Sequence, residues 1–90
     1  MNTETAEVIA IQAITHIVSD EFLLRSFLAQ SGIDEGIIKE RLLDHELQSA
    51  ALDFLLQRDD WLESFADQAN IQPELLVKAR HSLSPFALHE

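Results

Sequence analysis

Several residue types that would signal a particular chemistry are missing from this chain of 90 residues. It contains no cysteine and no tyrosine, only two glycines and only two prolines. Without cysteine, disulfides, a thiolate nucleophile and cysteine-ligated metal are excluded. The sequence also has no glycine-rich phosphate loop and no serine in a strand–elbow–helix context. The few glycines and prolines, beside abundant Ala, Leu, Ile, Glu and Gln, favour helices over strands. We therefore predict an all-α protein that is not an enzyme and that has no catalytic residues and no bound cofactor.

Positive charge is also scarce. Six lysines and arginines stand against sixteen acidic residues, which gives a formal net charge of −10. Such a chain repels phosphate backbones and anionic membrane surfaces. We therefore expect a protein partner with a neutral or basic surface, and neither nucleic acid nor a membrane.

Long hydrophobic runs are missing as well. The most apolar stretch, residues 8–18, is interrupted by Gln12, Thr15 and His16, and it is too short to span a bilayer. Residues 1–5 lack the basic start and apolar run of a signal peptide, so we expect a cytoplasmic protein.

What the chain does contain is a repeated pattern. Residues 9–38, moved along by about 38 positions, match residues 47–76. The identical aligned pairs include Leu24/Leu62, Ser26/Ser64, Phe27/Phe65, Gln30/Gln68 and Ile33/Ile71. Gly32 aligns with Asn70, and these two residue types are at ease in the left-handed conformation that closes a helix. The pattern predicts one domain, residues 1–90, built from two related helical units and a C-terminal tail over residues 84–90.

Capping residues and apolar spacing predict a compact bundle of about five or six short helices. We expect Thr3 to cap a central first helix, Asp34 to cap a short third helix, and Asp59 or Asp60 to cap the fifth. We place the first helix at about residues 4–18 and the fourth at about residues 46–57. The second helix should begin at Ser19 or Asp20 and end at Gly32, the fifth should end at Asn70, and the sixth should begin at Pro73 and end at Ser84-Pro85. Residues expected to face inward on the second and third helices are Phe22, Leu23, Leu24, Phe27, Leu28, Ile37, Ile38, Leu42 and Leu43.

The strongest local pattern is that of a helix-turn-helix. Leu28, Gly32 and Ile38 have the spacing of that motif, and Ala66, Asn70 and Leu76 repeat it in the second unit. A DNA-binding version would present cations on its second helix, and only the last helix offers a small excess of them. The nucleic-acid contacts would then be Lys78, Arg80 and His81. Plain helix packing is the commoner origin of this spacing, so we keep nucleic-acid binding as an alternative.

Two polar clusters have structural explanations. His16 and Asp20 have the spacing of two metal ligands on one helix face, but no second pair accompanies them, and Asp20 is well placed to cap the next helix. Asp59, Asp60 and Glu63 lie in the first turn of a helix, where the helix dipole favours acids. We therefore predict no metal site and no acid–base pair.

Aromatic residues provide the candidate partner-binding site. Most of Trp61 and the five phenylalanines should belong to the core, but their number is large for so small a domain. We expect some of them to line a surface groove, and the C-terminal tail offers further apolar residues. The candidate contact residues are Trp61, Phe65, Phe86 and Leu88.

Four stretches carry a resemblance to a known family. They are residues 6–13 (AEVIAIQA), 27–33 (FLAQSGI), 52–56 (LDFLL), and the stretch from Phe65-Ala66 to residues 71–74 (IQPE). With these stretches, the chain resembles, from about residue 4 to residue 83, a family of small all-helical proteins that is catalogued as a domain of unknown function and found mainly in alphaproteobacteria. The resemblance implies an uncharacterised bacterial cytoplasmic protein, and it supplies no activity, cofactor or catalytic residue.

The sequence thus leads to three functional hypotheses. We favour a protein-interaction or accessory module with an apolar groove rimmed by acids. The first alternative is a helix-turn-helix-like, nucleic-acid-associated regulator. The second is a structural subunit of a homo-oligomer, such as a homodimer.

Overall fold

Six α-helices make up the part of the protein that the structure, a computed structural model, describes: residues 1–83. They are α1 (Thr3–Val18), α2 (Glu21–Ser31), α3 (Glu35–Glu40), α4 (His45–Leu56), α5 (Asp59–Ala69) and α6 (Glu74–Leu83). Residues 1–83 contain no β-strand. The all-α prediction is therefore confirmed. Among these helices, none combines the length and the apolarity that crossing a bilayer requires.

The helices begin where short polar side chains accept hydrogen bonds from free N–H groups. The carboxylates of Asp20, Asp34 and Asp44 accept from the backbone at the starts of α2, α3 and α4. The prediction of Thr3 as the first cap is wrong by one residue. Asn2 holds this position, and its Oδ1 accepts a hydrogen bond of 2.8 Å from the Thr5 N–H.

The start of α5 also differs from the prediction. Arg58 occupies the N-cap position without a side-chain capping bond, and Asp59 and Asp60 lie inside the first turn. The two carboxylates therefore act on the positive end of the helix through its dipole and do not cap it.

Left-handed residues end α2 and α5, as the aligned Gly32 and Asn70 predict. Gly32 has φ 73° and Asn70 has φ 60°, and Asn70 is the only non-glycine with positive φ among the described residues. Each turns the chain so that its own N–H bonds back to the helix it closes, the Gly32 N–H to Leu28 and the Asn70 N–H to Ala66 and Asp67.

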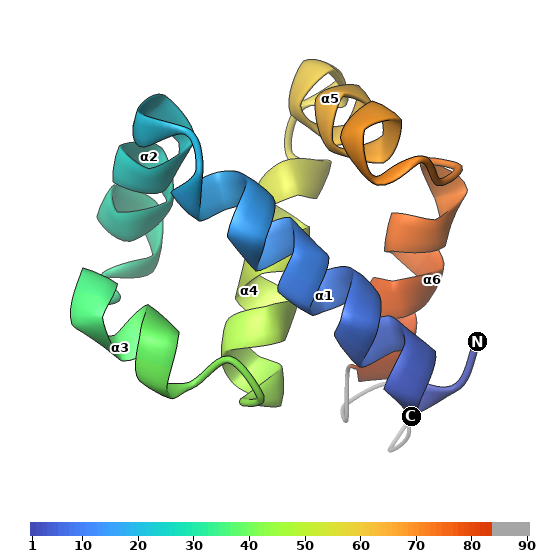
Figure 1. The fold of residues 1–90 in the computed structure, drawn as a ribbon, viewed down its shortest axis with the longest axis horizontal. Coiled ribbons are helices and arrows are strands. Elements are labelled where there is room, and N and C mark those ends of the chain that lie inside the picture. The colour runs from blue at the N-terminus through green and yellow to red at the C-terminus, as the bar shows by residue number, and fades with distance from the viewer. Residues whose placement is uncertain (84–90) are drawn as a thin grey trace.

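Helix α1 lies at the centre of the arrangement. It crosses in front of α4 in Figure 1, with α2 and α3 on the left and α5 and α6 on the right. It packs against α2, α4, α5 and α6, while α4 packs against α1, α2, α5 and α6. The two crossing helices thus form the centre of the bundle, which agrees with the apolar residues on more than one face of α1.

The core is built from aliphatic and phenyl side chains of all six helices. The largest of its fully buried side chains are Phe27, Phe54, Phe65, Ile17, Leu52, Leu55, Leu76 and Leu83. In each of the aligned pairs Ile14/Leu52, Ile17/Leu55 and Phe27/Phe65, both residues are buried.

Three residues expected to face inward, Phe22, Ile37 and Leu43, are exposed. Ile37 is exposed because the short helix α3 buries only its neighbour Ile38. Phe22 is 66% exposed because α2 packs along one face only, and Leu23 and Phe27, one turn apart, occupy that face. Leu43 is 73% exposed because α3 ends at Glu40, so Leu43 falls in the following turn and not on a helix.

Candidate functional site

A groove runs along the junction of α1 and α5, and we call it the α1–α5 groove. Its volume is about 310 Å³. Its lining residues are Ile11, Gln12, Thr15, His16 and Ser19 from the α1 side and Phe65, Gln68 and Ala69 from α5. The volume is at the lower limit for small-molecule clefts, so the groove suits a single side chain better than a cofactor.

The base of the groove is aromatic. Phe65 is 1% exposed, and the His16 ring meets it edge to face, with ring centroids 5.5 Å apart and an interplanar angle of 62°. Ile11 and Ala69 add aliphatic surface on either side. This part of the groove can bury an aliphatic or aromatic side chain of a ligand.

A polar bridge closes one side of the groove. Nδ1 of His16 is hydrogen-bonded to Oε1 of Gln68, which joins α1 to α5. Because an amide oxygen only accepts, this bond requires the proton on Nδ1, and Nε2 of the neutral ring is then an acceptor. Nε2 is buried and has no hydrogen-bond partner within residues 1–83. The bridge therefore holds the imidazole in one orientation against Phe65.

Acidic side chains lie at one end of the groove. A neighbouring hollow shares His16, Ser19 and Gln68 with it and adds Asp20, Ser64 and Asp67. Asp20 is fixed there because its Oδ1 accepts a hydrogen bond of 3.1 Å from the Leu23 N–H at the start of α2. The joined surface thus passes from an aromatic base to two carboxylates.

Two of the candidate partner-binding residues, Trp61 and Phe65, lie on α5 but pack in different places. Phe65 lies at the base of the α1–α5 groove. Trp61, half-buried on the same helix, does not line that groove. Its ring stacks on Phe54 of α4, with centroids 4.6 Å apart and an interplanar angle of 25°. Phe86 and Leu88 lie outside the described residues.

Arg58 and Asp60 form an ion pair beside Trp61. The Arg58 guanidinium makes two hydrogen bonds to the Asp60 carboxylate, of 2.9 and 3.1 Å, and its central carbon lies 5.1 Å from the centroid of the Trp61 ring. These hydrogen bonds lower the pKa of Asp60 and raise the pKa of Arg58. The Arg58 guanidinium, which lies over the Trp61 indole, is thus already paired with the Asp60 carboxylate.

The cations of α6 are in different situations. Arg80 forms an ion pair with Asp53 of α4, with 2.7 Å between Nε and Oδ1. Lys78 and His81 are exposed on the same helix. A nucleic acid approaching α6 would therefore meet one arginine whose charge is offset by a neighbouring carboxylate.

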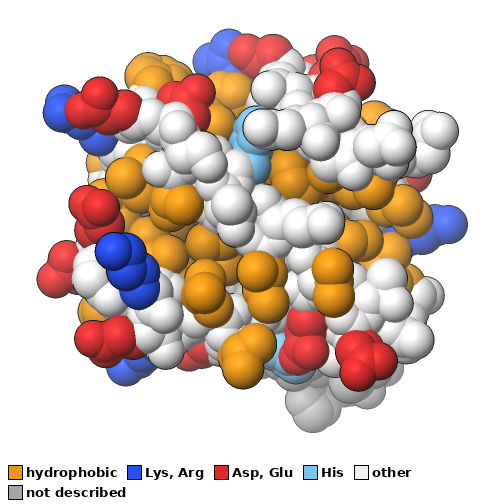
Figure 2. Space-filling model, in the orientation of Figure 1, with side chains coloured by type: hydrophobic (Ala, Val, Ile, Leu, Met, Phe, Trp, Pro, Cys, Tyr) orange, Lys and Arg blue, Asp and Glu red, His pale blue; other side chains and the backbone are white. Residues whose placement is uncertain are grey.

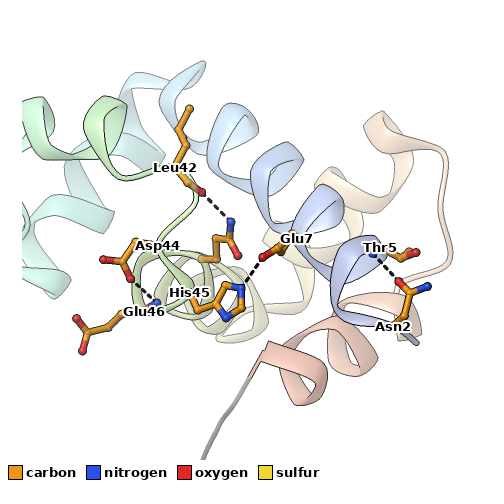
Figure 3. A network of polar contacts seen from close by, with 8 residues as sticks. Asn2, Thr5, Glu7, Leu42, Asp44, His45 and Glu46 are labelled. Atoms are coloured by element: carbon orange, nitrogen blue, oxygen red, sulfur yellow. Dashed lines mark hydrogen bonds and ion pairs between the residues drawn. The ribbon is translucent and has the colours of Figure 1, made fainter.

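The polar contact that connects the starts of α1 and α4 is drawn in Figure 3. Nε2 of His45 lies 2.5 Å from Oε2 of Glu7, and both side chains are half-buried. Gln48, in the next turn of α4, donates a hydrogen bond of 2.7 Å to the Leu42 carbonyl. No three His, Asp or Glu side chains of residues 1–83 lie close enough together to hold a metal ion. The Glu7–His45 pair therefore joins the two central helices, α1 and α4.

The site includes residues that the sequence reasoning did not select. The sequence marks His16 only as a possible metal ligand, and Gln68 only as one half of a repeated pair. The sequence feature that could have identified Gln68 is the repetition of glutamine at the aligned positions 30 and 68. Helix packing does not require the same polar residue at two exposed positions, so this repetition indicates another role. The approach of His16 to residue 68, 52 positions along the chain, was not readable from the sequence.

Comparison with models of known protein families gives a match over nearly the whole chain. The model of a family described as "Protein of unknown function (DUF3572)" matches residues 3–86. A search of curated proteins and a search of solved structures each gave no match.

Proposed function

The chain belongs to the DUF3572 family of proteins of unknown function, and we propose that it is a protein-interaction module whose α1–α5 groove binds a segment of a partner protein. The segment carries an aliphatic side chain followed by a cationic one. One observation carries the proposal: the groove joins an aromatic base to a pair of carboxylates at one end.

The apolar half of the groove supplies the affinity. Phe65 and the His16 ring form a base already arranged for a ligand, because helix packing buries Phe65 and the Gln68 bridge holds His16. Burying one aliphatic side chain there contributes about 1.5–3 kcal/mol. A single groove of this size supports weak, transient binding unless further contacts are added.

The charged half supplies the preference for a cation. Asp20 and Asp67 are acidic, and no lysine or arginine of residues 1–83 lines either hollow. Several of the chain's few arginines are paired with neighbouring carboxylates, namely Arg25 with Glu21, Arg58 with Asp60 and Arg80 with Asp53. The resulting field attracts a basic segment and repels an acidic one.

Nuclear magnetic resonance tests the proposal. Two capped hexapeptides, identical except for Leu-Arg or Leu-Glu at their centre, are titrated into the ¹⁵N-labelled full chain. We expect the Leu-Arg peptide to shift the amide signals of the groove residues, and the Leu-Glu peptide to do so far more weakly. The Gln12→Phe variant fills the groove and should remove the response. Val8→Phe is the matched control, because Val8 is 53% exposed one turn earlier on α1 and does not line the groove. Equal responses to the two peptides, or an unchanged response in Gln12→Phe, would contradict the proposal.

A structural homo-oligomer is the second candidate function, and exposed apolar residues favour it. Val8, Phe22 and Leu43 are more than half exposed. Figure 2 shows apolar side chains gathered over the middle of one face, with most acidic side chains nearer its outline. Sedimentation velocity over a hundredfold range of concentration separates the two candidates, because a constant monomer mass excludes self-association.

Nucleic-acid binding through Lys78, Arg80 and His81 has less support. The Arg80–Asp53 ion pair and the net charge of −10 both oppose phosphate binding. A band shift with duplex DNA that disappears as salt increases would revive this alternative.

A further inference from the structure

A second groove lies between α2 and α4, and we call it the α2–α4 groove. Its volume is about 210 Å³. Phe27, Gln30 and Ser31 line it from α2, and Ala50, Asp53, Phe54 and Gln57 line it from the α4 side.

The two grooves are made by aligned positions of the sequence. Each lining residue of the α2–α4 groove is 38 positions away from a residue that lines the α1–α5 groove. The α4 residues align with α1, and the α2 residues align with α5. The helices pack in the corresponding way. Helix α2 packs on α4 as the aligned helix α5 packs on α1, and α2 packs on α1 as α5 packs on α4. Two unrelated surface hollows would not coincide in this way at every position.

The aligned positions that hold identical residues have the same structural role in both grooves. Phe27 and Phe65 are aligned, and both are buried at the base. Gln30 and Gln68 are aligned, and each bridges its groove to the opposite side. Oε1 of Gln30 accepts a hydrogen bond of 2.7 Å from Nε2 of Gln57, just as Oε1 of Gln68 accepts from His16.

The differing positions change the charge of the second groove. Phe54 stands where the first groove has His16, and it meets Phe27 edge to face, with centroids 5.4 Å apart. The one carboxylate in the lining, that of Asp53, is paired with Arg80. Ala29 aligns with Asp67, so the acidic end of the first groove has no counterpart there. The α2–α4 groove therefore combines a fully aromatic base with a lining whose charge is balanced.

We propose that the α2–α4 groove is a second binding site, for an uncharged segment anchored by an aliphatic side chain, and that one chain binds two such anchors at once. This inference rests on the proposed function of the α1–α5 groove. Charge complementarity selects the occupant, because an unpaired cation finds no free carboxylate among the lining residues and a carboxylate is repelled by the net charge. A partner that offers both anchors in one segment gains from the high effective concentration of the second anchor.

The test uses the ¹⁵N-labelled full chain and an uncharged capped hexapeptide with Leu-Gln at its centre. We expect the amide signals of Ser31 and Ala50 to shift with this peptide. In Ala50→Phe, binding at the α2–α4 groove should weaken about tenfold or more, because the variant removes the space that buries the leucine. Gln12 is the aligned residue of the first groove, so Gln12→Phe is the matched control and should leave the Ser31 response unchanged. Gln57→Trp blocks the second groove from an exposed position and replaces Ala50→Phe if that variant loses its helical circular dichroism.

The outcomes separate the inference from the function on which it rests. Shifts in both grooves, each removed only by its own variant, support two sites. A response of the α1–α5 groove to Leu-Arg, with no response of Ser31 and Ala50 to Leu-Gln, overturns the second site and leaves the proposed function standing. If neither groove responds to either peptide, both proposals fail.

Discussion

Substituting Gly32 by alanine isolates the energetic cost of one left-handed residue. Gly32 ends α2 with φ 73°, and a Cβ atom built on it meets no atom of the described residues, 1–83, within 4 Å. Steric contact with the rest of the protein therefore adds nothing, and any loss of stability comes from the backbone conformation alone.

The expected loss follows from two opposing terms. Holding an L-residue with a Cβ in the left-handed region costs about 1–2 kcal/mol. Alanine also restricts the unfolded chain, which returns about 0.4–1 kcal/mol. The net destabilisation of Gly32→Ala is therefore about 1 kcal/mol, equivalent to a decrease of roughly 4–8 °C in Tm for a domain of this size.

The chain itself provides the control. Asn70 holds the aligned position at the end of α5 with φ 60°. Asparagine tolerates this region because its short polar side chain bonds locally. Gly32→Asn should therefore cost less than about 0.5 kcal/mol. Urea unfolding followed by Trp61 fluorescence and by circular dichroism measures both variants. Equal stability of Gly32→Ala and the wild type, or an equal loss in Gly32→Asn and Gly32→Ala, would refute the argument.

Three further predictions concern buried and charged side chains. Phe65→Ala should lose about 3–5 kcal/mol of unfolding free energy in urea, whereas Phe22→Ala should lose less than about 0.5 kcal/mol because Phe22 is 66% exposed. Gln48 is fully buried, and its Oε1 has no hydrogen-bond partner among residues 1–83. The carboxyl introduced by Gln48→Glu should therefore have a folded-state pKa above the ordinary value of glutamate, and stability measured in urea should decrease as pH rises above about 4. The pKa of Asp60 is lowered mainly by its hydrogen bonds to Arg58, so the stabilisation it provides is present at neutral pH and is lost as pH falls below about 4. In an NMR titration, Arg58→Gln should return that pKa toward the ordinary value of aspartate, and an unchanged pKa would contradict the pairing.

The secondary structure was largely readable from the sequence, and the candidate site was not. Asp20 and Asp34 cap helices as predicted, and Gly32 ends one, because each of these features depends on atoms within a few residues. The sequence placed the N-cap wrongly where two neighbouring residues were equally suitable as helix caps. Asn2 rather than Thr3 caps α1, and the acids after Arg58 fall inside α5.

The sequence by itself determined that this protein is all-α, that α2 and α5 end in left-handed residues, and that acids outnumber bases. These properties follow from residue type, helical periodicity and local hydrogen bonding, which need no knowledge of the partner helix. Only the tertiary structure decided that His16 meets Phe65 and Gln68, and that Phe22 stays outside the core. The physical reason is that a groove lies between helices far apart in the chain, and its shape depends on where those helices cross, which residue spacing within one helix does not encode.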